Sequence, residues 1–197
     1  LQLFKDDWSA LHGDVEIKGV TKYWLSVAQL LIKPFVLFRI SPNFVSLLSL
    51  LSSLPLVVTP NYWWLILLSL VLDGIDGSLA IVTTKTSKFG AALDSILDRC
   101  VEFIWAVALY KVGIHLGLLA VFIGAAWSQE YLRARAGGLG VKRVSKVSLS
   151  ERPVRAIFIL LAVAFSHWSA LIIVIATIFQ LTGFLQIFRT LNKDLKK

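Results

Sequence analysis

Residues 73–98 read DGIDGSLAIVTTKTSKFGAALDSILD and carry four aspartates between strongly apolar flanks. Asp73 and Asp76 precede the polar turn 83–88, and Asp94 and Asp98 follow it. A carboxylate within the hydrocarbon region of a bilayer is costly and is retained mainly where it has a function. The stretch therefore predicts a functional hairpin of two membrane helices.

The composition of the whole chain predicts a polytopic membrane protein. Of the 197 residues, 57% are hydrophobic and only 16% are charged, and the mean hydropathy is +0.76, which is far more apolar than a soluble domain. The net charge of +8 lies mostly between the apolar runs. This pattern is typical of membrane topology and of contact with anionic lipids, so nucleic acid is not an expected partner. The single cysteine, Cys100, excludes an internal disulfide and is expected to be a small packing residue.

The apolar runs predict an all-α protein with six membrane-spanning helices. We expect these helices at residues 43–58, 63–82, 89–111, 114–132, 150–165 and 169–188. Basic residues gather on one side of the spans, in the turn 83–88, a flexible basic loop 133–146 and the C-terminal tail. By the positive-inside rule, both termini and the opening of the site between the aspartates face the cytoplasm of an integral cell-membrane protein.

Residues 23–40 are apolar but contain Lys33-Pro34. Because proline breaks or kinks a helix and lysine is costly at mid-membrane, we expect an interfacial juxtamembrane helix, with a seventh span as the alternative. The expected organisation is a cytoplasmic segment with this helix (1–40), a six-helix membrane domain (41–190) and a basic cytoplasmic tail (191–197). The polar, acidic N-terminus shows no cleavable signal peptide.

The two aspartate pairs predict a metal site. Members of a pair share one helix face, and in an antiparallel hairpin both pairs lie about nine to twelve residues from the turn, at matching depth. Four carboxylates cannot all stay ionised in a low dielectric without a cation. Oxygen ligands without a nearby Cys or His favour Mg²⁺ or Mn²⁺. A divalent-metal site with room for a diphosphate is therefore expected, the alternative being four solvated aspartates near a helix end.

The spacing D-x2-D-G-x2-A, with a later G-x3-D-x3-D, resembles the signature of the CDP-alcohol phosphatidyltransferases, a family of six-span membrane enzymes. Seven of its eight positions are present: Asp73, Asp76, Gly77, Ala80, Gly90, Asp94 and Asp98. The eighth position is normally an arginine after the alanine, and Ile81 occupies it here. The resemblance covers about residues 40–190.

The resemblance implies transfer of a phosphatidyl group from a CDP-linked lipid such as CDP-diacylglycerol to the hydroxyl of an alcohol, with release of CMP. It implies two Mg²⁺ or Mn²⁺ ions held by the aspartates, Asp73, Asp76, Asp94 and Asp98, with Asp98 acting also as the general base. It implies nucleotide contacts from four residues, Asp73, Gly77, Ala80 and Gly90. A homodimer is expected for the family.

Two later segments resemble the branch of this family that uses inositol phosphate. They are YLRARA (131–136) and SERPVR (150–155), and the resemblance implies that Arg133, Arg152 and Arg155 hold the phosphate of the acceptor. Arg152 and Arg155 lie in the first turn of an expected helix, where the dipole disfavours cations, so they are not there to stabilise that helix. Glu130 stands where that branch has a small hydroxyl residue.

The main prediction is thus an enzyme of phospholipid biosynthesis whose acceptor is inositol phosphate or another polyol phosphate, with glycerol phosphate as the alternative. Contact with lipid headgroups is a competing role for the three arginines. A cation transporter is a weaker hypothesis, because the chain shows no internal repeat and its carboxylates gather toward one side of the membrane. An inactive family member is a third hypothesis, suggested by Ile81.

Overall fold

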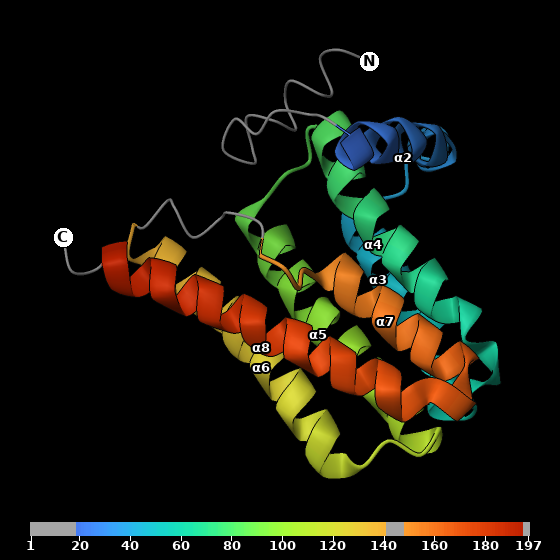
Figure 1. The fold of residues 1–197 in the computed structure, drawn as a ribbon. Coiled ribbons are helices and arrows are strands. Elements are labelled where there is room, and N and C mark those ends of the chain that lie inside the picture. The colour runs from blue at the N-terminus through green and yellow to red at the C-terminus, as the bar shows by residue number, and fades with distance from the viewer. Residues whose placement is uncertain (1–18, 141–147, 195–197) are drawn as a thin grey trace. The chain divides into compact units, whose positions relative to one another are not determined.

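The computed structural model describes residues 19–140 and 148–194, in which every regular element is helical (Figure 1). The α-helices are α2 (Gly19–Leu37), α3 (Pro42–Ser53), α4 (Trp64–Val82), α5 (Lys88–Lys111), α6 (Leu116–Gly138), α7 (Arg152–Ala164) and α8 (Ser169–Asp194). Short 3-10 helices are η1 (Leu54–Val57), η2 (Pro60–Tyr62) and η4 (Ser166–Trp168). The predicted all-α class is confirmed for these residues, whereas segment 1–18 and the end of the tail lie outside them.

The helices that carry the aspartates begin and end close to the predicted residues. The expected ranges 63–82 and 89–111 correspond to α4 and α5, and the turn between them was placed correctly. The basic segment was predicted less well, because α6 continues to Gly138 where a flexible loop was expected from residue 133. Alanine and arginine are strong helix formers, and they fill positions 133–136. Residues 141–147 of that expected loop lie outside the described residues.

Two described helices are long and apolar enough to cross a membrane, namely α4 and the stretch Ser166–Lys193, and the bent pair of α2 and α3 adds a third candidate. The chain is accordingly an integral membrane protein, while the count of six spans stays a prediction. Helix α7 has 13 residues, fewer than the ~20 that a perpendicular crossing needs. Helix α5 carries several charged residues, including Asp94, Asp98 and Arg99, so its apolarity alone does not mark it as a span.

Helix α2 runs through Pro34 without a break. The proline has no N–H to donate to the Leu30 carbonyl oxygen four residues earlier, and the helix ends three residues after it. The helix ends when Arg39 takes a left-handed conformation with φ of 54°, and the Ile40 amide then donates to the Phe35 carbonyl oxygen at 2.9 Å. After this turn the chain bends by 108° into α3.

The chain divides into two compact units. The first contains α2, most of α3, and the parts of α4 and α5 between residues 68 and 101. Its core joins three helices through the buried side chains Ile32, Val45, Ile75 and Leu79. The Ser49 hydroxyl also donates to the Ser69 carbonyl oxygen at 2.8 Å, which fastens α3 to the helix that carries Asp73 and Asp76. Cys100 is exposed on α5, so its predicted role as a packing residue is wrong.

The second unit contains residues 53–67 and everything from Glu102 onward. Within it α8 packs against α6 and α7, and a polar network fixes the segment before α7 against these helices. The amide of Gln180 donates to the Gln129 Oε1 atom at 2.9 Å, and the Ser150 hydroxyl donates to the Gln180 Oε1 atom at 2.7 Å. Gly183 permits this approach, because a Cβ there would lie 3.2 Å from the Gln129 Oε1 atom.

Candidate metal and substrate sites

Three carboxylates meet in the first unit. Asp73 and Asp76 on α4 and Asp94 on α5 each offer one oxygen, and these oxygens all lie within 4.8 Å of one another. Asp76 is only 5% exposed, and its Oδ2 atom accepts a hydrogen bond from the Ser46 hydroxyl at 2.5 Å. A set of hard oxygen donors with a hydrogen-bonded member suits Mg²⁺ or Mn²⁺. The group can therefore hold a metal ion, as the hairpin pattern predicted.

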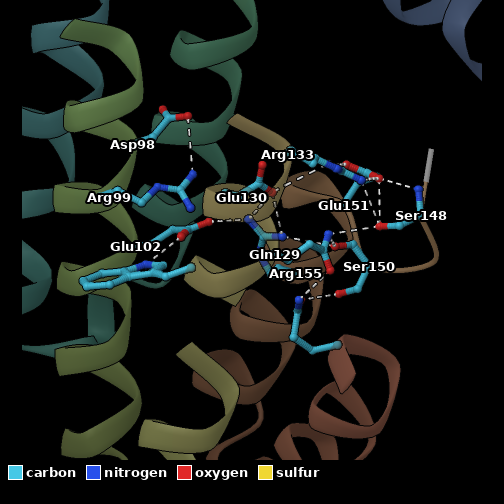
Figure 2. A network of polar contacts seen from close by, with 12 residues as sticks. Asp98, Arg99, Glu102, Gln129, Glu130, Arg133, Ser148, Ser150, Glu151 and Arg155 are labelled. Atoms are coloured by element: carbon cyan, nitrogen blue, oxygen red, sulfur yellow. Dashed lines mark hydrogen bonds and ion pairs between the residues drawn. The ribbon is translucent and has the colours of Figure 1, made fainter. Parts of the chain in front are cut away.

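Asp98 does not belong to this three-carboxylate group. It lies one helical turn after Asp94 on α5, and its Oδ2 atom lies 3.8 Å from the Arg99 guanidinium (Figure 2). Its side chain is 17% exposed, so the carboxylate keeps some contact with solvent. Its expected roles as a metal ligand and as the general base remain predictions.

A cavity of about 220 Å³ lies beside the three-carboxylate group in the first unit. Five of the motif residues line it: Asp76, Gly77, Ala80, Gly90 and Asp94. A Cβ at Gly77 would meet nothing within 4 Å, whereas a Cβ at Gly90 would lie 3.0 Å from the Ser87 hydroxyl oxygen. Gly77 thus leaves open space, and Gly90 allows the backbone of α5 to approach its surroundings closely.

Helix α3 contributes part of this cavity wall. Pro42, Asn43 and Ser46 all line the cavity, although none of them belongs to the motif. Ser46 was missed, because its contact with Asp76 joins positions 30 residues apart and a serine in an apolar helix gives no local signal.

The predicted acceptor arginines lie in the second unit, where Arg155 is almost fully buried at 2% exposed (Figure 2). Its Nη2 atom lies 2.8 Å from the Oε1 atom of Glu102, which is equally buried. The same Nη2 atom lies 3.4 Å from the Oε1 atom of Glu130, and its Nη1 atom donates to the Ser150 carbonyl oxygen at 3.1 Å. Glu102 also accepts a hydrogen bond from the Trp127 indole at 3.1 Å. Arg155 is therefore held by two carboxylates from different helices.

Arg133 on α6 forms an ion pair with Glu151, the residue that precedes α7. Its two terminal nitrogens reach both carboxylate oxygens of Glu151, one of them at 2.7 Å. The Ser148 amide and hydroxyl also donate to Glu151, at 2.5 and 2.9 Å. Burial alone would raise the pKa of Glu151, but the hydrogen bonds from Arg133 and Ser148 outweigh it and hold that pKa below its ordinary value. The ionised Glu151 thus holds the segment before α7 in place through its contacts with Arg133 and Ser148.

The structure brings two of the three predicted arginines to one carboxylate. The Glu130 Oε1 atom lies 3.4 Å from Arg155 and 3.7 Å from Arg133. The guanidinium of Arg152 instead lies over the Trp105 ring, 5.7 Å from its centroid. Sequence reasoning did not anticipate that glutamates would pair with these arginines. The unusual identity of Glu130 was the one available signal for this pairing.

In this all-helical membrane chain, three carboxylates that can hold a metal ion lie beside a cavity lined by small residues. The sequence model of the CDP-alcohol phosphatidyltransferases matches residues 39–182. The chain belongs to the CDP-alcohol phosphatidyltransferase family, which confirms the resemblance drawn from its motif.

Similar proteins narrow the comparison within that family. The chain is 37% identical to the archaetidylinositol phosphate synthase of Aeropyrum pernix over 105 residues, which is 53% of this chain and 54% of that protein. It is 37% identical to the bifunctional IPC transferase and DIPP synthase of Aquifex aeolicus over 83 residues, 40% of this chain and 19% of that protein. The chain thus spans about half or less of the length of these two relatives.

A longer match is the phosphatidylinositol phosphate synthase of Cutibacterium acnes, which is 28% identical over 178 residues, or 78% of this chain and 84% of that protein. The crystal structure of Mycobacterium tuberculosis phosphatidylinositol phosphate synthase with CDP-DAG bound has a TM-score of 0.68 with this chain at 18% identity. The match covers 86% of this chain and 94% of that one. At this identity the likeness shows a shared fold.

Proposed function

We propose that the chain is an integral membrane phosphatidyltransferase that moves a phosphatidyl group from a CDP-linked lipid to a hydroxyl of a polyol phosphate, with release of CMP. The observation that carries the proposal is the meeting of Asp73, Asp76 and Asp94 beside a cavity lined by the small residues of the motif. The names of the relatives from Aeropyrum and Cutibacterium favour inositol phosphate over glycerol phosphate as the acceptor.

The four aspartates have two roles in this proposal, metal binding and proton transfer. Two Mg²⁺ or Mn²⁺ ions held by Asp73, Asp76, Asp94 and Asp98 would neutralise the diphosphate of the donor and the charge on the departing CMP. Ser46 orients the Asp76 carboxylate through its hydrogen bond. Asp73, Gly77, Ala80 and Gly90 contact the nucleotide.

In the reaction, the acceptor oxygen forms a bond to the phosphorus of the phosphatidyl group. The bond between that phosphorus and the CMP oxygen breaks, and CMP leaves with the electron pair. Asp98 accepts the proton of the attacking hydroxyl as a general base. Its partial exposure keeps the carboxylate within reach of a hydroxyl that arrives from solvent.

Arg133, Arg152 and Arg155 hold the phosphate of the acceptor in this proposal. Guanidinium groups suit this role, because their planar forks bind phosphate oxygens in pairs. The polyol would then be anchored by its phosphate while a free hydroxyl reacts. The glutamates that pair with Arg133 and Arg155 must compete with this phosphate.

The proposed membrane arrangement has six spans in a domain of residues 41–190, with both termini and the site on the cytoplasmic side. The 108° bend between α2 and α3 supports α2 as an interfacial helix, because a helix so inclined to its neighbour does not continue its path. In this arrangement residues 1–40 form a cytoplasmic segment with the interfacial helix, and residues 191–197 form a basic cytoplasmic tail. The protein is a homodimer.

The deciding experiment uses purified protein in liposomes with CDP-diacylglycerol or its ether-lipid counterpart, Mn²⁺ or Mg²⁺, and a panel of acceptors. The panel contains inositol phosphate, glycerol phosphate, inositol and serine. We expect metal-dependent release of CMP with inositol phosphate, abolished by EDTA, and a lipid product of matching mass. Absence of CMP release with every acceptor, while Mn²⁺ still binds, would support the inactive-member hypothesis instead.

A further inference from the structure

The two carboxylate partners of Arg155 differ in strength. Glu102 is 2% exposed and lies 2.8 Å away, whereas Glu130 is 28% exposed and lies 3.4 Å away. A short, dry ion pair holds its members in place, while a longer pair in contact with water is weak and exchanges readily. Arg155 therefore has one fixed partner and one replaceable partner.

Charge balance makes replacement of a carboxylate necessary. The ion pairs of this network join two arginines, Arg133 and Arg155, to three glutamates, Glu102, Glu130 and Glu151. A phosphate monoester carries a charge of about −1.5 to −2 at neutral pH, so its arrival would add negative charge where carboxylates already outnumber their arginine partners. One glutamate must give way if the phosphate is to reach these arginines.

Glu130 is the glutamate best placed to leave. Its Oε1 atom lies between Arg155 and Arg133, at 3.4 and 3.7 Å, which is where a single phosphate would contact both guanidinium groups. Glu102 is held by Trp127 as well as Arg155, and Glu151 is held by both Arg133 and Ser148.

We propose that Glu130 is a specificity-determining residue whose carboxylate occupies Arg155 and Arg133 until the phosphate of the acceptor displaces it. The proposal rests on the proposed function, because it requires the acceptor to bind at these arginines. Glu130 thereby lowers the affinity for phosphate and discriminates against weakly charged anions, which do not displace it.

The test compares Glu130→Gln, which keeps the size and removes the charge, with Glu130→Asp, which keeps the charge. We expect Glu130→Gln to lower the KM for inositol phosphate about 3- to 10-fold, with kcat and the KM for CDP-diacylglycerol unchanged. Unphosphorylated inositol should show no such gain, and Glu130→Asp, which keeps the charge on a shorter side chain, should gain less than Glu130→Gln. An unchanged or raised KM for inositol phosphate in Glu130→Gln would overturn the proposal.

Direct binding separates this proposal from the proposed function. Calorimetric titration with inositol phosphate, without donor lipid, should show about 3- to 10-fold tighter binding by Glu130→Gln even if no acceptor supports CMP release. Equal binding by both proteins would overturn the role of Glu130 alone. Glu102→Gln serves as the structural comparison, because it should lower the melting temperature by removing the shorter and more buried ion pair of Arg155, whereas Glu130→Gln should not.

A second observation concerns the turn at the end of α4. Thr84 has a φ of 52°, a left-handed conformation that usually belongs to glycine. The Lys85 amide donates to the Ala80 carbonyl oxygen at 2.9 Å, and the Thr84 amide donates to the Ile81 carbonyl oxygen at 3.1 Å. This turn brings Lys85 into the wall of the cavity beside the three-carboxylate group, together with Ile81.

Among the described residues that line this cavity, Lys85 is the one cation, while Asp76 and Asp94 are acidic. Ile81 occupies the motif position where an arginine is usual, and its side chain brings no charge to the same wall. We infer that Lys85, four residues after Ile81, supplies a positive contact to the donor from this cavity wall. This inference also rests on the proposed function, since it concerns the CDP-linked lipid.

The test removes the positive charge at residue 85 and then supplies one at residue 81. We expect Lys85→Met to weaken binding of CDP-diacylglycerol about 10-fold, and Ile81→Arg in the Lys85→Met background to restore most of it. Lys88→Met is the matched control, because Lys88 is exposed and begins α5 without lining the cavity. Equal losses in Lys85→Met and Lys88→Met, or no rescue by Ile81→Arg, would overturn the inference. Lipid binding is measured without acceptor, so this result does not depend on turnover.

Discussion

Asp76 and Asp98 belong to the same motif but have different surroundings. Asp76 is buried, accepts a hydrogen bond from Ser46 and shares a group with two other aspartates. Asp98 lies outside that group, beside Arg99. A carboxylate fixed by hydrogen bonding suits metal binding, and a partly exposed carboxylate can receive the proton of an arriving hydroxyl.

Replacing Asp98 by asparagine should therefore stop turnover while leaving the donor bound. We expect Asp98→Asn to lower kcat by about 10²- to 10⁴-fold, the usual contribution of a general base, with little change in the Kd for CDP-diacylglycerol. Single-turnover CMP release and lipid-binding assays measure the two effects separately. Unchanged kcat would remove Asp98 as the base.

Ser46→Ala tests the orientation of Asp76. Loss of the hydrogen bond to the carboxylate should weaken Mn²⁺ binding by about 10-fold or more, as removal of a supporting partner does in other metal sites. Ser52→Ala is the control, because the Ser52 hydroxyl donates only to the Ser49 carbonyl oxygen of its own helix in the described contacts. Equal Mn²⁺ affinities in the two variants, measured by electron paramagnetic resonance, would contradict the supporting role of Ser46.

At the scale of the elements, a buried polar network holds the segment 148–151 in place within the second unit. Gln129 on α6 and Gln180 on α8 are both fully buried, and each bonds to Ser150. Buried polar groups are costly unless every partner is present. This network fixes where α7 begins and hence where Arg155 enters its pair with Glu102.

The lowered pKa of Glu151 predicts an acid-sensitive connection. Because the folded form holds the ionised carboxylate, Glu151 contributes stability above its ordinary pKa of 4.5 and loses that contribution as the pH falls through the lower folded value. The difference in melting temperature between the unmodified protein and Glu151→Gln should be full at pH 7 and should shrink as the pH falls below about 4.5. A difference independent of pH would show that Glu151 does not act through its charge.

Two glycines give a matched test of the contact between α6 and α8. A Cβ at Gly183 would lie 3.2 to 3.3 Å from Gln129 and Ser150, whereas a Cβ at Gly124 would meet nothing within 4 Å. Gly124→Ala should raise stability by up to about 1 kcal/mol through helix propensity, and Gly183→Ala should lower it by crowding the network. Similar stabilities for both variants in a thermal unfolding assay would contradict the close approach at Gly183.

At the scale of the whole molecule, the helices could be predicted and the polar contacts between them could not. The bounds of α4 and α5 followed from apolar runs interrupted by a polar turn. The aspartate spacing predicted a group of four carboxylates, of which the structure brings Asp73, Asp76 and Asp94 together. The pairs Arg155–Glu102 and Gln180–Gln129 join positions more than 50 residues apart. Such pairs depend on how helices pack, which periodicity within one helix does not encode.

Metal binding should raise the stability of the intact protein. A ligand that binds only the folded state stabilises it by about 2.7 kcal/mol at 100 times its Kd, so Mn²⁺ should raise the melting temperature and EDTA should reverse the rise. The double variant Asp73→Asn/Asp76→Asn should show no such rise, since it removes two of the three grouped carboxylates. An equal rise in that variant would place the metal elsewhere.

The exposure of Cys100 gives the protein a natural attachment site for a spectroscopic label. It is the one cysteine of the chain, it is exposed, and it lies two residues after Asp98 on α5. A thiol-reactive nitroxide would attach there alone, without any prior substitution. Paramagnetic Mn²⁺ bound by the aspartates would then broaden the nitroxide spectrum, whereas diamagnetic Mg²⁺ would not. The broadening would measure the distance between the label and the metal in lipid.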